Sequence, residues 1–451
     1  MMFKTFRIGG IHPEENKITA EIETCVAELP QQAFFPLSQH IGAPAVPIVK
    51  KGDKVKVGTK IAEAGGPVSA PVHSSVSGTV TKIGTIIDAT GYNKPVIIIK
   101  TEGDEWEESI DRSDALETLD GHDGLTPEYI ITRIRDAGIT GMGGAGFPTY
   151  VKLTPPSTSK IDCVIINAVE CEPYITSDYR LMMEHADEIL VGVKLVLMAV
   201  SAPVAYIGIE RNKPEAIRLF QEKTIGERSI KIVPLEQKYP QGGEKQLIDA
   251  VTRRQVPDPP AIPANVGTVV VNVGTAFAVY QAVMKNKPLF ERYTSVSGKH
   301  ISQPKNFLVR MGTPISQLID ACGGLPDGDN KIIAGGPMMG KALMTTGVPV
   351  CKGTNSITVL SGKEAVRDGA TGPCIRCAKC VGVCPMGLEP YILATSSAAH
   401  NWDMAEEHFI TSCIECGSCQ YTCPANRPML DNIRFGKSKE MTIIRTRKQK
   451  S

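Results

Sequence analysis

Two copies of one cysteine motif constrain this 451-residue chain more than any other feature of its sequence. The first copy has the spacing C-x2-C-x2-C-x3-C before a proline and consists of Cys374, Cys377, Cys380 and Cys384. The second copy repeats that spacing, again before a proline, and consists of Cys413, Cys416, Cys419 and Cys423. The first three thiolates of such a motif can bind three corners of one [4Fe–4S] cluster, whereas the fourth cysteine binds the other cluster.

We therefore predict two [4Fe–4S] clusters with crossed ligands. Cluster 1 is expected to be held by Cys374, Cys377, Cys380 and Cys423. Cluster 2 is expected to be held by Cys413, Cys416, Cys419 and Cys384. Structural zinc is the alternative, but zinc needs only four ligands and has no use for a third cysteine and a Cys-Pro ending, repeated. Two clusters in one module, with helices expected between the motifs, serve to pass single electrons.

Composition and charge exclude several classes of protein. Lys plus Arg is 49 and Asp plus Glu is 48, so no overall field favours nucleic acid. The N-terminus has no apolar core typical of a signal peptide, and the clustered cysteines indicate a reduced, cytosolic metal binder. The apolar stretch 189–209 contains Lys194 and Pro203, which favours a buried helix, a turn and a strand over a membrane span.

The chain divides into a β-rich N-terminal region and three further modules. Val/Ile runs separated by turn residues predict strands over residues 1–115, and the segment 49–84 resembles the barrel-sandwich hybrid of biotinyl and lipoyl carrier domains. Its hairpin, AEAGGPVSAPVH, has no lysine to carry a cofactor, so an interaction or scaffold role is expected.

The remaining modules alternate between helices and strands. Residues 125–256 predict an α/β domain with a mainly parallel sheet, and residues 257–350 predict a small α+β module with one short helix. The cysteine-rich module is expected over 360–436. A basic tail follows over 437–451; it is expected either to touch anionic lipid or to be solvated and disordered.

A glycine-rich loop, GITGMGGAGFP over residues 138–148, follows a predicted amphipathic helix. Glycines let backbone N–H groups approach a phosphate closely, although a plain tight turn explains the loop better in isolation. The segment GMGGAGFPTYVK resembles the flavin loop of the NADH-oxidising flavoprotein subunit of respiratory complex I. Three further segments, NAVECEP, YPQGGE and NVGT, are similar to that family's remaining flavin-contacting stretches and follow in the same order.

This resemblance implies a set of cofactor-binding residues. The FMN phosphate would be held by Gly141, Gly143, Gly144, Gly146 and Lys152. The ribityl chain and ring would contact Asn167, Glu170, Tyr239, Gly242, Asn272 and Thr275. The nicotinamide nucleotide would face Phe147 and Glu172, with Glu244 nearby. Met142, Val169 and Gly243 depart from the family's Arg, Asp and Glu, which leaves NADH contacts at those positions in doubt.

Taken together, the modules resemble the RnfC family, whose members belong to the Rnf complex, a ferredoxin:NAD oxidoreductase. The implied fold is a barrel-sandwich hybrid, an α/β FMN/NADH-binding domain, a small β-grasp-like (SLBB) module and a helical two-cluster ferredoxin module. Corrinoid reductases share the flavin and ferredoxin parts but carry the barrel at the C-terminus, so they are one alternative. A non-catalytic electron-wiring adaptor, with a merely structural glycine loop, is the other.

The implied function is hydride exchange between NAD(H) and FMN, followed by single-electron transfer through both clusters. Hydride transfer needs no acid or base from the protein, so we predict no catalytic side chain. The implied partners are the membrane subunits that translocate ions and a ferredoxin-type electron carrier or iron–sulfur subunit. The implied location is peripheral, on the cytoplasmic face of the bacterial cell membrane.

Overall fold

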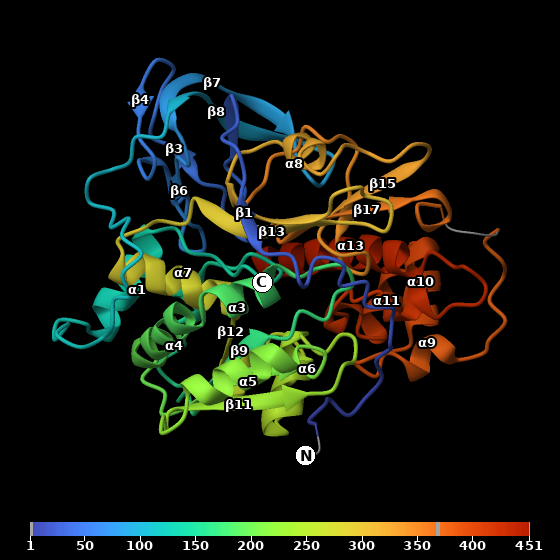
Figure 1. Ribbon diagram of the computed structural model, residues 1–451. Helices are drawn as coiled ribbons and strands as arrows, with labels where there is room; N and C mark the ends of the chain where they lie inside the picture. Colours follow the sequence, from blue (N-terminus) through green and yellow to red (C-terminus); the bar gives the residue numbers. More distant parts are fainter. Residues whose placement is uncertain (1–2, 367–369, 451) are drawn as a thin grey trace.

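The computed structural model describes residues 3–366 and 370–450. The described residues form a β-rich module, an α/β domain, a second sheet and a helical C-terminal module (Figure 1). An N-terminal segment, residues 3–27, precedes the first module and contacts the other three, through Lys4, Gly10 and Ala27.

The β-rich module consists of two small antiparallel sheets that share one core. The sheets have the strand orders β2-β8-β7-β4 and β3-β5-β6. The strands are β2 (Gln32–Pro36), β3 (Val46–Pro47), β4 (Lys54–Val55), β5 (Lys60–Glu63), β6 (Val72–His73), β7 (Ser77–Ile87) and β8 (Asn93–Gly103). Phe35, Ile61 and Ile97 are fully buried between the sheets, as alternation along a strand requires. The predicted β-rich character is confirmed, but these sheets begin at Gln32 and not at the start of the chain.

The α/β domain has a four-stranded parallel sheet with the order β11-β10-β9-β12. The strands are β9 (Cys163–Ala168), β10 (Ala205–Glu210), β11 (Ile230–Leu235) and β12 (Thr268–Asn272). The chain adds β10 and β11 on one side of β9 and then returns to place β12 on the other side. The order therefore reverses between β9 and β12, and in open α/β sheets such a switch point is where ligands bind.

Helices cover both faces of this sheet. They are α1 (Pro127–Asp136), α2 (Thr149–Lys152), α3 (Ser177–Glu184), α4 (Ala186–Ala199), α5 (Pro214–Lys223), α6 (Glu244–Thr252) and α7 (Val273–Met284). Helices α1, α4 and α7 pack together on one face, and α6 contributes to the core on the other. The predicted amphipathic helix before the glycine loop is α1: Thr126 caps it, Pro127 occupies its first position, and Ile130 and Ile134 are buried.

The predicted domain boundary at residue 257 is wrong. Strand β12 pairs with β9, and α7 packs against α4, so residues 268–284 belong to the α/β domain. Pro257 to Pro260 indicated a linker, but the linker crosses the sheet and leads to another strand of the same domain.

The third module is a six-stranded sheet with the order β1-β14-β13-β17-β15-β16 and one short helix, α8 (Ile315–Asp320). Its strands are β13 (Glu291–Ser297), β14 (Lys305–Arg310), β15 (Asn330–Ala334), β16 (Lys341–Ala342), β17 (Ser356–Ser361) and, from the N-terminal segment, β1 (Thr24–Val26). Strand β1 runs parallel to β14, with Cys25 opposite Phe307. The predicted short helix is present as α8, but residues 257–350 also contain α7, so the prediction of one helix over that range is wrong. The edge strand from the N-terminal segment is an addition that the sequence did not predict.

The C-terminal module is helical. It contains α9 (Lys379–Gly382), α10 (Pro390–Ala398), α11 (Trp402–Glu407), α12 (Ser418–Tyr421) and α13 (Met429–Lys450), and it lies beside β15 and β17 (Figure 1). The helices predicted between the cysteine motifs are confirmed as α10 and α11. The expectation of a disordered basic tail is wrong, because α13 continues through Lys450, and Arg447 forms an ion pair with Glu406.

The apolar stretch 189–209 folds as predicted into the end of α4, a turn and most of β10. Within residues 3–366 and 370–450, we find no helix with both the length and the apolar character that crossing a membrane requires.

Candidate cofactor site

The four segments predicted to contact flavin meet at the carboxyl ends of β9 and β12. The side chain of Asn167, near the end of β9, donates to the carbonyl of Gly242 at 2.8 Å. The backbone N–H of Met142 donates to Thr275 Oγ1 at 2.9 Å. The Asn272 side chain accepts from the N–H groups of Gly274 and Thr275 and so caps α7. The switch point therefore gathers segments that are more than 100 residues apart in the chain.

The glycine loop has the space that close approach of a ligand requires. Gly141 N–H donates to the Phe147 carbonyl at 2.8 Å and closes the loop. A Cβ at Gly143 would lie 2.6 Å from Asn272 Nδ2, so only glycine fits there. A Cβ at Gly144 would meet no atom within 4 Å, so this part of the backbone faces open space. Gly146 has a φ of +66°. The loop fits a phosphate that backbone N–H groups approach closely.

Lys152 and Glu244, both predicted site residues, contact each other. Lys152 Nζ lies 2.7 Å from Glu244 Oε1 and donates to the carbonyl of Val270, in β12, at 3.0 Å. Lys152 is half-buried, so its charge stays at the edge of the sheet beside the glycine loop. A phosphate bound there would meet a lysine that is already oriented by β12.

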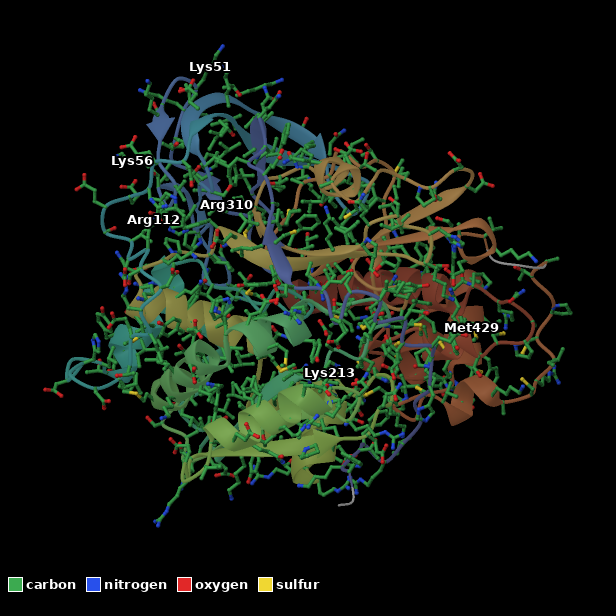
Figure 2. The ribbon with its side chains drawn as sticks, viewed as in Figure 1. Lys51, Lys56, Arg112, Lys213, Arg310 and Met429 are labelled. Atoms are coloured by element: carbon green, nitrogen blue, oxygen red, sulfur yellow. The ribbon has the colours of Figure 1, made fainter. Side chains whose placement is uncertain are left out.

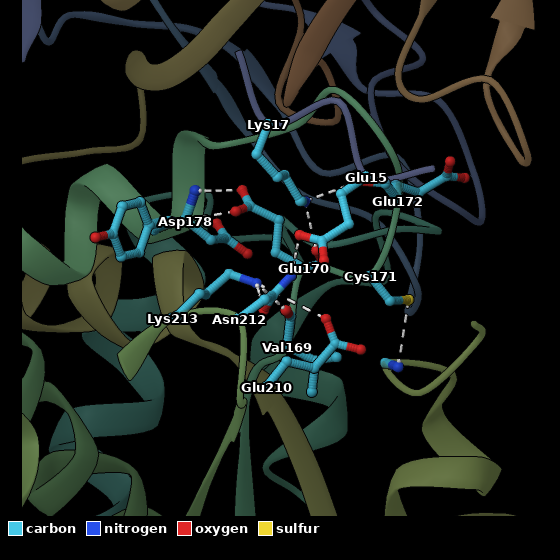
Figure 3. A network of polar contacts seen from close by, with 12 residues as sticks. Glu15, Lys17, Val169, Glu170, Cys171, Glu172, Asp178, Glu210, Asn212 and Lys213 are labelled. Carbon is cyan, nitrogen blue, oxygen red and sulfur yellow. Dashed lines mark hydrogen bonds and ion pairs between the residues drawn. The ribbon is translucent and has the colours of Figure 1, made fainter. Parts of the chain in front are cut away.

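The acidic loop, residues 169–175, follows β9 and is drawn in Figure 3. The Glu170 carboxylate accepts from the N–H groups of Asp178 at 2.7 Å and Tyr179 at 3.4 Å, at the start of α3. Asp178 accepts from Asn272 Nδ2 at 2.7 Å. Burial and the neighbouring Glu170 raise the pKa of Asp178 to about 7. Glu170 thus joins the site through Asp178 and Asn272.

Glu172, which is predicted to face the nicotinamide nucleotide, contacts the third module. Its carboxylate accepts from the N–H groups of Met338 at 3.1 Å and Met339 at 2.7 Å, in the loop of the third module. A Cβ at Gly336 would overlap Glu172 Oε2, so the GGPMMG sequence leaves room for this carboxylate. Burial raises the pKa of Glu172 to about 7. The side chain ties two modules together here instead of pointing into open space, and its nucleotide contact stays a prediction.

Tyr239 lies between the flavin segments and the second cysteine motif. Its side chain is buried, and its hydroxyl donates to the carbonyl of Cys416 at 2.8 Å. Gln246, in α6, donates to the Pro385 carbonyl at 3.1 Å. The α/β domain therefore contacts the residues around the predicted cluster 2 directly, and the flavin contact of Tyr239 stays a prediction.

The four predicted ligands of cluster 2 surround one cavity. Cys384, Cys413, Cys416 and Cys419 line it, together with apolar side chains such as Leu393 and Ile433. Burial raises the pKa of the Cys413 thiol to about 12 and also raises the pKa of the other three thiols. Cluster binding must therefore displace protons from these thiols. The arrangement fits a four-iron cluster with the predicted ligands.

The predicted ligands of cluster 1 lie nearer the surface. Cys374 and Cys377 are exposed, whereas Cys380 and Cys423 are half-buried. The two ends of this set are adjacent in space, because Gly372 N–H donates to the Ala425 carbonyl at 2.9 Å. This contact holds the start of the first motif beside Cys423.

The two motifs repeat their backbone as well as their sequence. Arg376 and Glu415 hold equivalent positions and have φ values of +56° and +57°. Ala378 and Gly417 are also equivalent, with φ values of +56° and +76°. Left-handed backbone is uncommon at Arg, Glu and Ala, so both loops are strongly constrained in shape. We infer that each loop is shaped to wrap one cluster.

The barrel module docks on the glycine loop. Its hairpin accepts a hydrogen bond from Tyr150 Oη at the Pro67 carbonyl, 2.6 Å away, and Ile41 N–H donates to the Gly146 carbonyl at 3.1 Å. The hairpin that carries the cofactor lysine in carrier domains thus contacts the predicted flavin loop here.

Several buried or half-buried cations of the site were not predicted from the sequence. Lys352 Nζ donates to the carbonyls of Pro71 and Gly138, each at 2.7 Å, and burial lowers its pKa to about 7. Arg292 donates to the carbonyl of Met142 at 3.4 Å. Lys17 and Lys213 bind carbonyls of the acidic loop (Figure 3). A lysine or arginine looks like a surface residue in a sequence, so no local signal indicated these positions.

Comparison with protein families identifies each module. The Nuo51 FMN-binding domain matches residues 134–281, and the RnfC barrel-sandwich hybrid domain matches residues 4–104. The SLBB domain matches residues 293–342, and the 4Fe-4S dicluster domain matches residues 366–424. The predicted fold class is confirmed. The barrel is N-terminal, which is the order that separated the Rnf-type interpretation from a corrinoid reductase.

Relatives resemble the chain over nearly its whole length. The C subunit of the proton-translocating ferredoxin:NAD(+) oxidoreductase complex of Clostridium ljungdahlii is 43% identical, over 97% of this chain and 94% of the relative. The C subunit of the Na(+)-translocating ferredoxin:NAD(+) oxidoreductase complex of Acetobacterium woodii is 42% identical, over 96% of each chain. A crystal structure of an NAD+-reducing [NiFe]-hydrogenase in the H2-reduced state has a TM-score of 0.48 at 20% identity, covering 70% of this chain and 62% of that chain.

Proposed function

Because the chain belongs to the RnfC family of ion-translocating ferredoxin:NAD oxidoreductase complexes, we propose that it exchanges hydride between NAD(H) and FMN and passes single electrons through two [4Fe–4S] clusters. FMN, when bound, supplies the conversion between a two-electron hydride donor and one-electron carriers. The chain's own contribution is to bind these groups and to hold them in the order in which electrons pass.

One observation carries this proposal: the predicted flavin segments and the second cysteine motif contact each other through buried side chains. Tyr239 lies in the α/β domain, between β11 and α6, and donates to the Cys416 carbonyl at 2.8 Å. Cys416 lines the cavity of predicted cluster 2. We therefore propose that cluster 2 exchanges electrons with the flavin site and that cluster 1, nearer the surface, exchanges them with a partner.

Three residues that differ from the complex I pattern, Met142, Val169 and Gly243, limit which side chains can contact the nucleotide. Met142 and Val169 are buried in the two cores of the α/β domain, so neither side chain is available to a ligand. A Cβ at Gly243 would lie 2.5 Å from Gln246 Oε1, so a glutamate there would have to displace the Gln246 side chain. We propose that NAD(H) relies instead on Phe147, within the glycine loop, and on Glu244, whose side chain is 40% exposed.

The surface around cluster 1 favours an acidic electron carrier. Arg376 and Lys379 lie within the first motif and are exposed, and no ion pair of either is found with the described residues. Ile375, 63% exposed, lies between Cys374 and Arg376. A basic surface around an apolar centre fits a ferredoxin-type partner with an acidic face, because complementary charge steers association. The proposed location is peripheral, on the cytoplasmic face of the bacterial membrane, where NAD(H) is present.

The first test is an anaerobic preparation of the full chain, assayed for iron, sulfide and flavin and then titrated with NADH. We expect about eight iron atoms and one FMN per chain, with bleaching of the flavin absorbance when NADH is added. Eight iron atoms without flavin and without an NADH response would instead favour an electron-wiring adaptor. Reduction of added cobalamin, in preference to a ferredoxin, would favour a corrinoid reductase.

The partner proposal has a separate test. The double variant Arg376→Glu/Lys379→Glu reverses the charge beside cluster 1, and we expect electron exchange with an acidic ferredoxin to slow roughly tenfold at low salt. Bleaching of the flavin by NADH should not change. Lys50→Glu/Lys51→Glu makes the same charge change on the barrel, where Lys51 lies at an outer tip (Figure 2), and is the control. Equal slowing in both double variants would contradict the partner proposal.

A further inference from the structure

Lys17 contacts three backbone carbonyls of the acidic loop at once. Its Nζ donates to the carbonyls of Glu170 at 2.8 Å, Glu172 at 2.9 Å and Ile175 at 2.7 Å. An ammonium group has three N–H donors, so each donor of Lys17 is used on this one loop. Figure 3 shows the side chain reaching the loop from the N-terminal segment.

The acidic loop needs such a contact to keep its shape. Two of its non-glycine residues, Glu170 and Tyr174, have φ values of +49° and +68°. This left-handed backbone costs about 1–2 kcal/mol per residue, so it persists only where surrounding contacts hold it. Lys213 adds a second contact, since its Nζ donates to the Val169 carbonyl at 2.8 Å.

The backbone that carries Lys17 is itself fixed on both sides. On one side, the Glu15 carbonyl accepts from Tyr174 N–H at 2.9 Å. On the other, Thr19 Oγ1 lies 2.5 Å from Thr176 Oγ1, and the Thr19 carbonyl accepts from Asn306 Nδ2 at 2.7 Å. Lys17 therefore reaches the loop from a segment whose backbone is fixed. The loop's carbonyls bind an ammonium group that is held in place.

The orientation of Glu170 depends on this arrangement. Its carbonyl binds Lys17, while its carboxylate binds the start of α3 and lies beside Asp178, which accepts from Asn272. Asn272 also lies against Gly143 of the glycine loop. A change in the backbone at Glu170 would therefore reach the residues expected to contact FMN through two hydrogen bonds.

We propose that Lys17, carried by the N-terminal segment, is a positioning residue that holds the acidic loop in the shape required for FMN binding. This inference rests on the proposed function, since it assumes that the chain binds FMN. It assigns a role in the flavin site to a segment that lies outside the α/β domain and more than 150 residues before Glu170.

The test compares Lys17→Met with Lys17→Arg and Lys4→Met in the full chain. Lys17→Met keeps the length of the side chain but leaves three carbonyls without their donor, and we expect FMN affinity to fall roughly tenfold. Lys17→Arg restores N–H donors and should recover affinity to within about threefold. Lys4 belongs to the same segment but donates to a single carbonyl, that of Val251 at 3.1 Å, so Lys4→Met should bind FMN as the wild type does.

Two readouts separate positioning from general destabilisation. FMN affinity is measured by quenching of flavin fluorescence as flavin-free chain is added, and hydrogen exchange of the flavin-free chain reports on the loop. We expect faster exchange over residues 169–175 in Lys17→Met, with unchanged exchange in β10 and β11. If Lys17→Met does not fold, Lys17→Gln, which retains two donors, is expected to show an intermediate loss of affinity.

The outcomes distinguish this inference from the proposed function. FMN affinity within twofold of the wild type in Lys17→Met, with unchanged exchange in the acidic loop, would overturn the role of Lys17 alone. Failure of the wild-type chain to bind FMN would overturn the proposed function instead. Lower affinity in Lys17→Met without recovery in Lys17→Arg, accompanied by faster exchange throughout the α/β domain, would show a structural role only.

Discussion

The two cysteine motifs share a sequence and a backbone but lie in different surroundings. In the first motif, Cys374 and Cys377 are exposed. In the second, Cys416 and Cys419 are buried, and the motif packs against Tyr239 and the third module. This difference indicates that two copies of one motif can have two tasks in the same chain. Under the proposed function, the enclosed copy exchanges electrons within the chain, and the accessible copy exchanges them with a partner.

Removal of one cysteine ligand from each motif should produce the largest difference between the two motifs. Cys419→Ser removes one of the four ligands of the enclosed cluster. We expect about four iron atoms to be lost and NADH-driven cluster reduction to disappear. Cys377→Ser should lose about four iron atoms from the accessible cluster but retain NADH-driven reduction of the other. Iron analysis and electron paramagnetic resonance after addition of NADH measure both. The opposite pattern would show that the first motif serves the flavin site.

Glu172, in the acidic loop near the enclosed motif, should make the free energy of unfolding depend on pH. Burial raises its pKa from 4.5 to about 7, so the folded chain binds this proton more tightly than the unfolded chain does. The free energy of unfolding should therefore fall as pH rises from 4.5 to 7, by up to about 3 kcal/mol from this group, and stay constant above 7.

Urea unfolding at pH 5 and pH 7.5 measures this dependence. Glu172→Gln should reduce it by the share of this group, because the amide does not titrate, whereas Asp178 and Glu210, whose pKa values burial also raises to about 7, should keep the remainder. Glu63→Gln, which changes an exposed carboxylate paired with Lys60, should keep the wild-type dependence. A pH dependence that is unchanged in Glu172→Gln would assign it to other groups.

A smaller effect is expected from the hydroxyl that joins the flavin segments to the enclosed motif. Tyr239→Phe leaves the buried Cys416 carbonyl without its donor, which should lower the free energy of unfolding by about 1–2 kcal/mol. Tyr421 lies between Cys419 and Cys423 but is 55% exposed, so Tyr421→Phe should cost almost nothing. Urea unfolding of both variants measures the difference, and equal losses would contradict it.

The smallest expected effect comes from exchanging the residues at equivalent turns. Ala378→Gly relieves left-handed backbone at an alanine and should stabilise the chain by about 0.5–1 kcal/mol. Gly417→Ala introduces that strain and places a Cβ 3.0 Å from the Met338 carbonyl, so it should destabilise by about 1 kcal/mol or more. Thermal unfolding of the cluster-loaded chain measures both. Changes of the same sign would show that the two turns are not equivalent.

Short-range patterns in the sequence predicted much of this molecule. The spacing of the cysteines, the helix that begins at Pro127 and the short helix α8 each depend on residues close together in the chain. The four flavin segments were found because each contains a local motif. Their convergence follows from a parallel sheet, whose strands all end at one edge.

Long-range pairing was not predictable in the same way. Strand β1 has only three residues and joins a sheet formed about 280 residues later, and no pattern in Thr24–Val26 indicates that partner. The place of β12 beside β9 was missed because Pro257 and its neighbours resemble a linker. Buried Lys352 and half-buried Lys17 were missed because lysine usually lies at the surface, and only the converging carbonyls of the fold explain their positions.

The course of the N-terminal segment has a consequence for synthesis of the chain. Residues 3–27 are synthesised well before their partners, which include Leu308 and Val383. The nascent segment must therefore remain without these contacts until its partners have been translated. Lys17 can bind the acidic loop once that loop is made, but β1 must wait for β14. Assembly of the flavin site should thus finish late, and a stalled or truncated nascent chain should expose this segment to proteases.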